Sequence, residues 1–295
     1  MKRTLIAACA AALGALALSS CQVPDASPRD VARIGPAVSA RTVAYGSASW
    51  ARLDVAPSRS GPSHGTIVWV HGGAWIAGSN SFAEVPAYVT ALLDAGWSIV
   101  SVEYPSALLA TPGEMVRSVQ DATGYVRRNA AALGVVGDVI VLGGHSAGGW
   151  LAAMAADDAL HVDAVLAFSA PLDLAALAGN MVPLYGFNLA SITNVLLDCA
   201  ELDPKAVDRC GGRKLAEWSF TERVKPGGAP MYLGYGDRDE VVNVRDQRAA
   251  ATKLVGVLGD TRVWVDVAER SGHGAEGVNV SYLKIFLVMV ADGWL

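Results

Sequence analysis

Short apolar runs bounded by glycine, proline or aspartate recur along the chain and alternate with longer stretches of helical composition. These runs are nearly continuous and rich in β-branched residues, which is typical of strands buried on both faces of a parallel sheet. The predicted strands are 66–70, 98–102, 138–142, 162–168, 231–235 and 261–267, and the predicted helices are 114–133, 147–160 and 280–291. This alternation predicts an α/β fold with a mostly parallel, doubly wound sheet.

The interval between Pro171 and Pro230 interrupts the alternation. We expect a small cap insertion there, at about residues 171–229, lying over one edge of the sheet. Its apolar side chains, together with two tryptophans elsewhere, are candidates to line a substrate pocket, although ordinary core packing fits the pattern equally well. The candidate pocket residues are Trp75, Trp150, Leu184, Tyr185 and Phe187.

The first residues are typical of an export signal. Met1 to Thr4 carries two positive charges, and Leu5 to Leu18 contains no polar side chain. That apolar run suits a signal peptide and is shorter than the ~20 residues that span a bilayer as a helix. The sequence therefore predicts an exported protein of the bacterial cell envelope.

Leu18-Ser19-Ser20-Cys21 resembles the bacterial lipobox, in which a lipidated cysteine becomes the mature N-terminus. We therefore expect a lipoprotein signal peptide at 1–20, lipidation at Cys21, a proline-containing tether at 21–40 and the α/β domain at 41–295. A membrane would then be a partner through the lipid anchor. The alternative is an ordinary secretory signal in which Cys21 has no special role.

Composition narrows the class of protein. Hydrophobic residues make up 52% of the 295 positions and charged residues 17%, which excludes a disordered chain. A net charge of −5 without a basic run argues against nucleic acid as a partner.

Of the four cysteines, Cys199 and Cys210 would remain for a disulfide in an oxidising compartment, with two free thiols as the alternative. No metal site is expected, because two cysteines without a nearby histidine cannot fill four zinc positions.

Gly-x-Ser-x-Gly occurs twice, around Ser63 and around Ser146. The pattern indicates a nucleophilic serine only on a sharp turn from a strand into a helix. Residues 61–65 precede a strand and follow a polar stretch, so Ser63 is interpreted as a loop residue. Residues 144–148 follow a predicted strand and open a predicted helix, so Ser146 is the candidate nucleophile.

A serine nucleophile needs a base, and in α/β hydrolases the order along the chain is serine, acid, histidine. Only His161 and His273 follow Ser146, and His161 opens the very next strand, with no intervening loop that could carry the acid. His273 is therefore the predicted base.

The acid should follow the penultimate strand, where two aspartates compete. Asp239 is the preferred candidate and Asp237 the alternative, because spacing alone does not separate them. The acid would hold the imidazole of the base in its productive tautomer.

The negative charge of an acyl-transfer intermediate needs preorganised donors. The amide of Ala147, directly after the nucleophile, is one candidate. The turn after the first predicted strand offers the others, at Gly72, Gly73 and Ala74, because glycine lets the main chain approach a substrate closely.

Taken together, these segments resemble the bacterial carboxylesterases of the α/β-hydrolase superfamily, near the hormone-sensitive-lipase and kynurenine-formamidase-like branches. The similar segments are His71-Gly72-Gly73-Ala74-Trp75, Gly144-His145-Ser146-Ala147-Gly148-Gly149, Gly236-Asp237-Arg238-Asp239 and Ser271-Gly272-His273, within a resemblance that covers about residues 42–290. The resemblance implies an α/β-hydrolase fold, Asp239 as the acid, and oxyanion donors at Gly73 and Ala74. Two departures stand out: Ala74 replaces a third glycine, and Tyr104-Pro105 replaces a common Tyr-Arg.

The sequence thus predicts a serine hydrolase that cleaves small-molecule carboxylic esters through an acyl-enzyme on Ser146, with no metal or other cofactor. An amidase or formamidase and a carbohydrate deacylase are alternatives, because one triad serves all of them. A catalytically silent, surface-anchored binding module is the alternative from another class. The sequence leaves the oligomeric state open.

Overall fold

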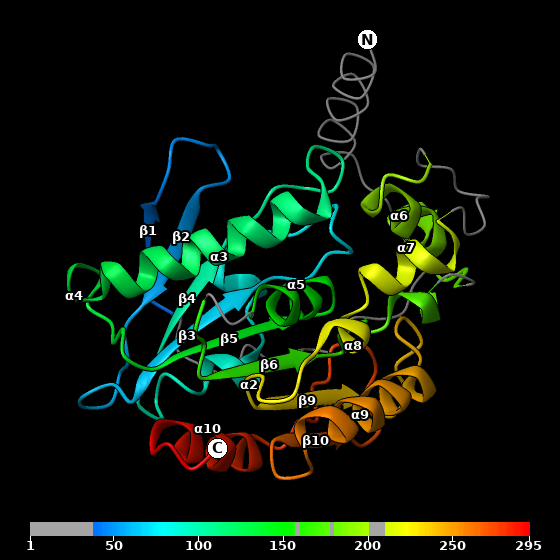
Figure 1. Cartoon of the computed structure of the whole chain (residues 1–295). Coiled ribbons are helices and arrows are strands. Elements are labelled where there is room, and N and C mark those ends of the chain that lie inside the picture. The colour runs from blue at the N-terminus through cyan, green and yellow to red at the C-terminus, as the bar shows by residue number, and fades with distance from the viewer. Residues whose placement is uncertain (1–37, 157–159, 178–179, 201–209) are drawn as a thin grey trace. The chain divides into compact units, whose positions relative to one another are not determined.

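The computed structural model describes residues 38–156, 160–177, 180–200 and 210–295 (Figure 1). The predicted signal peptide, Cys21 and the predicted tether up to residue 37 lie outside the described residues. Within the described ranges, no helix is both long enough and apolar enough to cross a bilayer.

Most of the described strands join one mixed sheet, with the order β1-β2-β4-β3-β5-β6-β9-β10. The strands are β1 (Arg41–Ala44), β2 (Arg52–Ala56), β3 (Gly65–Val70), β4 (Trp97–Val102), β5 (Ile140–His145), β6 (Ala164–Phe168), β9 (Met231–Gly236) and β10 (Val263–Ala268). β2 pairs antiparallel with both β1 and β4, and every other pair in this sheet is parallel. The prediction of a mostly parallel α/β sheet is confirmed.

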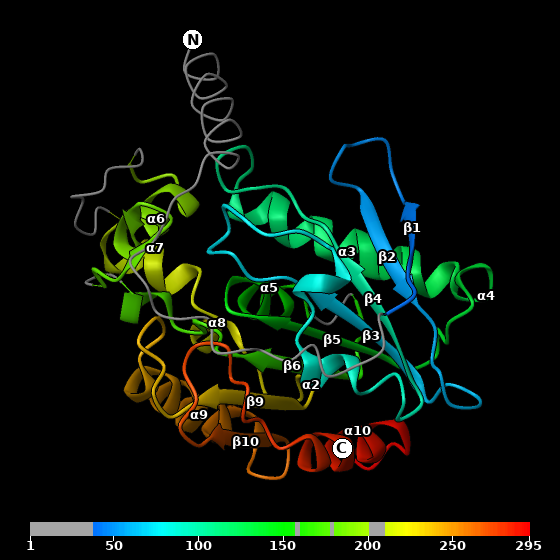
Figure 2. The same ribbon diagram turned by 180° about the vertical axis from the view of Figure 1, so that it is seen from behind.

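Helices cover both faces of the sheet (Figures 1 and 2). Side chains of β3 alternate between two hydrophobic clusters, with Val68 and Val70 in one and Ile67 and Trp69 in the other. The first cluster packs against α3 (Pro112–Arg128), α4 (Ala130–Leu133), α5 (Ala147–Ala155) and α9 (Val244–Leu258). The second packs against the short 3-10 helix η1 (Phe82–Glu84), α2 (Ala87–Thr90) and α10 (Val280–Ala291). Burial of the central strands on both sides explains their continuous apolar sequences.

The chain between β6 and β9 forms the segment that the sequence marks as an insertion. Its elements are η2 (Leu174–Leu177), a hairpin of β7 (Pro183–Leu184) and β8 (Phe187–Asn188), α6 (Leu189–Leu196), α7 (Gly211–Glu217) and α8 (Phe220–Arg223). A disulfide joins Cys199 to Cys210, with their Cα atoms 5.0 Å apart. This bond links the chain after α6 to the start of α7.

Several boundaries differ from the predicted ones. The helix predicted at 114–133 begins two residues earlier, because Thr111 and Glu114 form a reciprocal capping box, and it is interrupted at Asn129. The helix predicted at 147–160 ends at Ala155. β5 continues through two glycines to His145, which brings the end of the strand directly to Ser146. Strands β1 and β2 were not among the predicted strands.

Candidate active site

Ser146 lies between the end of β5 and the first residue of α5, in a conformation that non-glycine residues rarely adopt, with φ 53° and ψ −123°. The turn is tight because two glycines meet inside it: a Cβ at Gly144 would lie 2.4 Å from the carbonyl carbon of Gly148. The N–H of Ser146 donates to the Phe168 carbonyl of the neighbouring strand at 2.7 Å. This strained turn presents the hydroxyl above the edge of the sheet.

The structure brings the three predicted triad residues together. Nε2 of His273 lies 2.9 Å from Oγ of Ser146, and Nδ1 lies 3.0 Å from each carboxylate oxygen of Asp239. The three residues come from three strand ends, after β5, β9 and β10. Because Nδ1–H donates to the carboxylate, Nε2 is left to accept the serine proton. The side chain of His273 is 23% exposed, so the site is open to solvent.

The Asp239 carboxylate is held by several donors besides His273. The N–H groups of Val241 and Val242 donate to Oδ1 at 3.0 and 2.9 Å, and Nε2 of Gln247 donates to Oδ2 at 2.9 Å. Burial by itself would raise the pKa of this carboxyl, but the hydrogen bond and charge of His273, with the two amides, lower its pKa below the usual range. Asp239 is therefore an anion positioned for the histidine.

Asp237 and Ser63, the alternatives to Asp239 and Ser146, form hydrogen bonds with other residues. Asp237 is exposed and accepts the N–H of Ser271 at 3.2 Å, which steadies the loop carrying the histidine. Ser63 donates to the Gly65 carbonyl at 2.8 Å and lies 3.1 Å from the hydroxyl of Ser98, in a turn before β3. The geometry at the histidine thus favours Asp239 over Asp237 and Ser146 over Ser63.

The predicted oxyanion turn follows β3 and lies against the serine. A Cβ at Gly72 would lie 3.5 Å from Cβ of Ser146, and Gly73 and Ala74 both have positive φ, at 111° and 50°. Among the described residues, the N–H groups of Gly73, Ala74 and Ala147 donate to no protein acceptor. Unpaired amides next to a nucleophile are the donors that a developing oxyanion requires.

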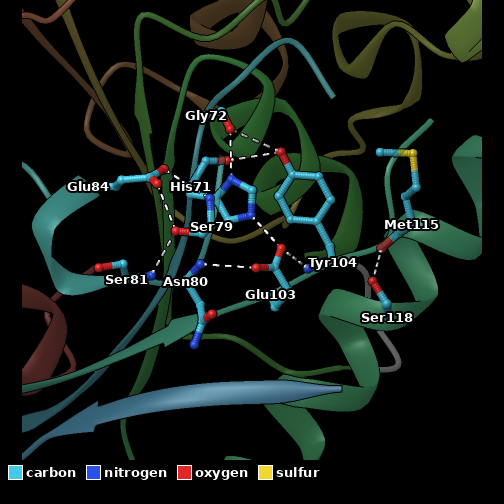
Figure 3. Close-up of polar contacts among 10 residues, drawn as sticks. All are labelled: His71, Gly72, Ser79, Asn80, Ser81, Glu84, Glu103, Tyr104, Met115 and Ser118. Atoms are coloured by element: carbon cyan, nitrogen blue, oxygen red, sulfur yellow. Dashed lines mark hydrogen bonds and ion pairs between the residues drawn. The ribbon is translucent and has the colours of Figure 1, made fainter. Parts of the chain in front are cut away.

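A polar network behind this turn was missed at the level of sequence (Figure 3). His71 bonds to Glu103, and the hydroxyl of Tyr104 donates to the His71 and Gly72 carbonyls at 3.2 and 3.3 Å. Glu103 directly follows the buried strand β4, and polar residues at the carboxyl ends of parallel strands are a recognised signal for a functional site. Gln247, the donor to Asp239, lies within α9 and has no such signal.

His145, next to the nucleophile, is also placed to support the triad. Its Nε2 donates to the carbonyl of His273 at 2.7 Å, and the two imidazole rings are 4.9 Å apart. Burial first, and then the charge of His273, lower the pKa of His145 from 6.5 to about 4. A neutral His145 therefore holds the main chain of His273.

This shift predicts a pH-dependent contribution to stability. The pKa of His145 is lower in the folded than in the unfolded chain, so stability is lost as pH falls from 6.5 towards 4. His145→Gln keeps a donor for the His273 carbonyl but has no side chain that titrates in this range. We therefore expect its unfolding free energy to fall by up to about 3 kcal/mol less than that of the wild type over the same pH range. Urea unfolding of both proteins at several pH values checks this, and parallel curves would contradict it.

The candidate pocket residues differ in how deeply they are buried. Trp75 and Trp150 are 1% and 0% exposed and pack edge to face in the hydrophobic core, so the expectation that they line a pocket is corrected. Trp150 also donates to the Trp218 carbonyl at 2.9 Å. Leu184 and Phe187 pack partly buried against the same core. Tyr185, at the hairpin tip with φ 52°, is 57% exposed.

A nucleophile on a strained strand-to-helix turn and a Ser–Asp–His arrangement on a mostly parallel sheet define an α/β hydrolase. The comparison with protein families agrees with that class. The chain belongs to the BD-FAE family, whose model matches residues 53–254.

Three individual proteins that the chain resembles share 20% to 29% sequence identity with it. The chain is 29% identical over 212 residues to the esterase LipQ of Mycobacterium tuberculosis, an alignment that covers 70% of this chain but only 48% of that protein. The fold is similar to a carbohydrate esterase from gut microbiota, with TM-score 0.71, 20% identity and coverage of 86% of this chain and 96% of the other. It is also similar to an esterase from Thermogutta terrifontis, with TM-score 0.61, 21% identity and coverage of 87% and 93%. At these identities the structural matches show the fold.

Proposed function

We propose that this chain is a serine esterase that hydrolyses small-molecule carboxylic esters through an acyl-enzyme on Ser146. The observation that carries the proposal is the continuous set of hydrogen bonds from Ser146 through His273 to Asp239, beside three unpaired amides. The esterase name of the LipQ relative supports the same class of substrate.

The geometry accounts for both halves of the reaction. As Oγ of Ser146 attacks the ester carbonyl carbon, Nε2 of His273 takes the hydroxyl proton, and the amides of Gly73, Ala74 and Ala147 receive the negative oxygen. The ester C–O bond then breaks, and His273 gives its proton to the departing alcohol. Water attacks the acyl-serine while His273 takes a proton from it, and that proton returns to Ser146 as the acid leaves.

A fluorophosphonate probe tests the nucleophile. A structure of the Thermogutta terrifontis esterase is phosphonylated by sarin, an organophosphorus reagent of the same chemistry. We expect stoichiometric labelling of the chain, none of Ser146→Ala, and full labelling of Ser63→Ala, which carries the second Gly-x-Ser-x-Gly motif. An unlabelled wild-type chain would contradict the proposal and favour a silent binding module.

The class of substrate is tested separately. p-Nitrophenyl esters of increasing acyl length, the matching anilides and an acetylated sugar should be compared at equal enzyme concentration. We expect kcat/KM to be highest on an ester, because an alkoxide or phenolate leaves more readily than an unprotonated amide nitrogen, and among the described residues the site offers no acid besides His273 to protonate that nitrogen. A preference for the anilide would assign an amidase instead.

We also propose that the chain is exported and anchored to a membrane through lipid on Cys21, on the strength of the segment from Met1 to Cys21. Wild-type chain expressed with its own leader should partition into detergent, and Cys21→Ser should stay in the aqueous phase. Equal partitioning of the two would contradict the lipid anchor.

A further inference from the structure

Both ring nitrogens of His71 face oxygen atoms that accept hydrogen bonds (Figure 3). Nδ1 lies 2.7 Å from the Gly72 carbonyl oxygen, and Nε2 lies 2.8 Å from Oε1 of Glu103. The ring stacks on Tyr104 with a 4.3 Å separation, and only 3% of the side chain is exposed. The surroundings therefore fix how many protons the ring must carry.

A neutral imidazole has one N–H and satisfies only one of these two contacts. The Gly72 carbonyl can only accept, and Glu103 could donate only if it were protonated. The carboxylate also accepts the N–H of Tyr104 at 3.1 Å on Oε1 and the N–H of Asn80 at 3.2 Å on Oε2. Two main-chain N–H groups thus point at this carboxylate, so its oxygens act as acceptors and both protons are assigned to His71.

The Gly72 carbonyl and the Gly73 N–H are two ends of one peptide group. A hydrogen bond onto the carbonyl polarises the peptide and strengthens its N–H as a donor. Here that carbonyl accepts from Nδ1 of His71 and from the hydroxyl of Tyr104. The charge of the ring thus acts through the peptide on the Gly73 N–H, one of the proposed oxyanion donors.

We propose that His71 is an imidazolium, paired with the Glu103 carboxylate, and that it positions and polarises the Gly72–Gly73 peptide so that the Gly73 N–H stabilises the oxyanion. This inference rests on the proposed esterase site. His71 is a positioning residue, since it acts through the peptide and not on the substrate.

Other ionisable groups near the ring make no bond to it in the described part of the chain. Glu84 accepts from the N–H and hydroxyl of Ser79, and His145 lies across Gly72, where a Cβ would be 3.0 Å from its Nδ1. Gly78 leaves the space that the ring fills, because a Cβ there would lie 2.3 Å from Nδ1 of His71. Glu103 is therefore the anion that balances the ring.

Glu103→Gln tests the charge, and Glu84→Gln, in the adjacent segment, is the matched control. In Glu103→Gln no anion balances the ring, so His71 should lose one of its two protons, while a side chain of the same size keeps the ring in place. We expect kcat to fall about 10-fold with KM unchanged, less than the 10²–10³-fold cost of losing a whole oxyanion donor. Affinity for a trifluoromethyl ketone, which mimics the tetrahedral intermediate, should fall by the same factor.

A spectroscopic measurement on the unaltered chain tests the protonation without any change of residue. With 15N-labelled histidine at about pH 7, His71 should show two protonated nitrogens in the wild type and in Glu84→Gln, and one in Glu103→Gln. A single protonated nitrogen in the wild type, or an unchanged kcat in Glu103→Gln, would overturn the inference. If Ser146→Ala is inactive and Glu103→Gln matches the wild type, only the role of His71 fails. If Ser146→Ala keeps activity, the proposed site itself is wrong.

Discussion

Replacing Asp239 by asparagine should lower kcat by about four orders of magnitude and leave the fold intact. An amide at this position has one accepting and one donating end. The N–H groups of Val241 and Val242 both point at Oδ1, so the amide oxygen must take that place. The amide NH₂ then occupies the position of Oδ2, 3.0 Å from Nδ1 of His273, whereas the oxygen at Oδ1, also 3.0 Å from Nδ1, already accepts the two N–H groups.

A donor at that position selects the wrong tautomer of the histidine. Nδ1 would accept from the asparagine, and Nε2 would carry the proton and face the serine hydroxyl as a donor, so His273 would no longer be a base. The amide of Gln247 would also meet a second donor, because its Nε2 already points at Oδ2. The loss should therefore appear in kcat with little change in KM.

Asp237→Asn is the matched control, since its side chain is exposed and an asparagine oxygen still accepts the N–H of Ser271. We expect its kcat to stay within about threefold of wild type, as for most exposed substitutions. Steady-state kinetics on one p-nitrophenyl ester, with circular dichroism to check folding, measures both variants. A larger loss in Asp237→Asn than in Asp239→Asn would overturn the assignment of the acid.

Gly148→Ala should destabilise the protein by at least about 3 kcal/mol. A Cβ at this position would lie 2.2 Å from the Val70 carbonyl oxygen and 2.3 Å from that of His71. Both atoms belong to the main chain, so no side-chain rotation relieves the overlap. The start of α5 would have to move away from the end of β3, which separates the nucleophile from the oxyanion turn.

Gly256→Ala is the control for this substitution. Gly256 lies inside α9, and a Cβ there would meet no atom within 4 Å. Because alanine favours helix more than glycine does, we expect this variant to be more stable by up to about 1 kcal/mol. Urea denaturation gives the unfolding free energy of both variants, and active-site titration gives the fraction of molecules with a competent site. An unfolding free energy of Gly148→Ala close to wild type would show that the turn tolerates a side chain.

Much of the site follows from order and local context along the chain. Ser146 is separable from Ser63 because only one of the two motifs joins a predicted strand to a predicted helix, and His273 follows because few histidines come after the serine. The choice between Asp237 and Asp239 depends on contacts from residues distant in sequence, above all Gln247 and the loop of His273. Spacing contains no information about those contacts.

The parts that sequence did not predict have physical reasons. β1 and β2 lie at one edge of the sheet, where β1 is mostly exposed and lacks the continuous apolar pattern of a buried strand. Trp75 and Trp150 are large enough to suggest a binding surface, but each fills the core. Hydrophobicity alone cannot distinguish a side chain that contacts a ligand from one that fills the interior.

The connection between β6 and β9 joins neighbouring strands, paired from Val165↔Met231 to Phe168↔Gly234. Because the two strands are parallel, the chain leaves the sheet at the carboxyl end of β6 and returns to it at the amino end of the neighbouring strand β9, whatever the length of the excursion. Doubling such a loop costs only about 0.6 kcal/mol in closure entropy. Natural variation and laboratory grafting can therefore exchange this whole excursion while the reacting groups keep their places on the unchanged framework.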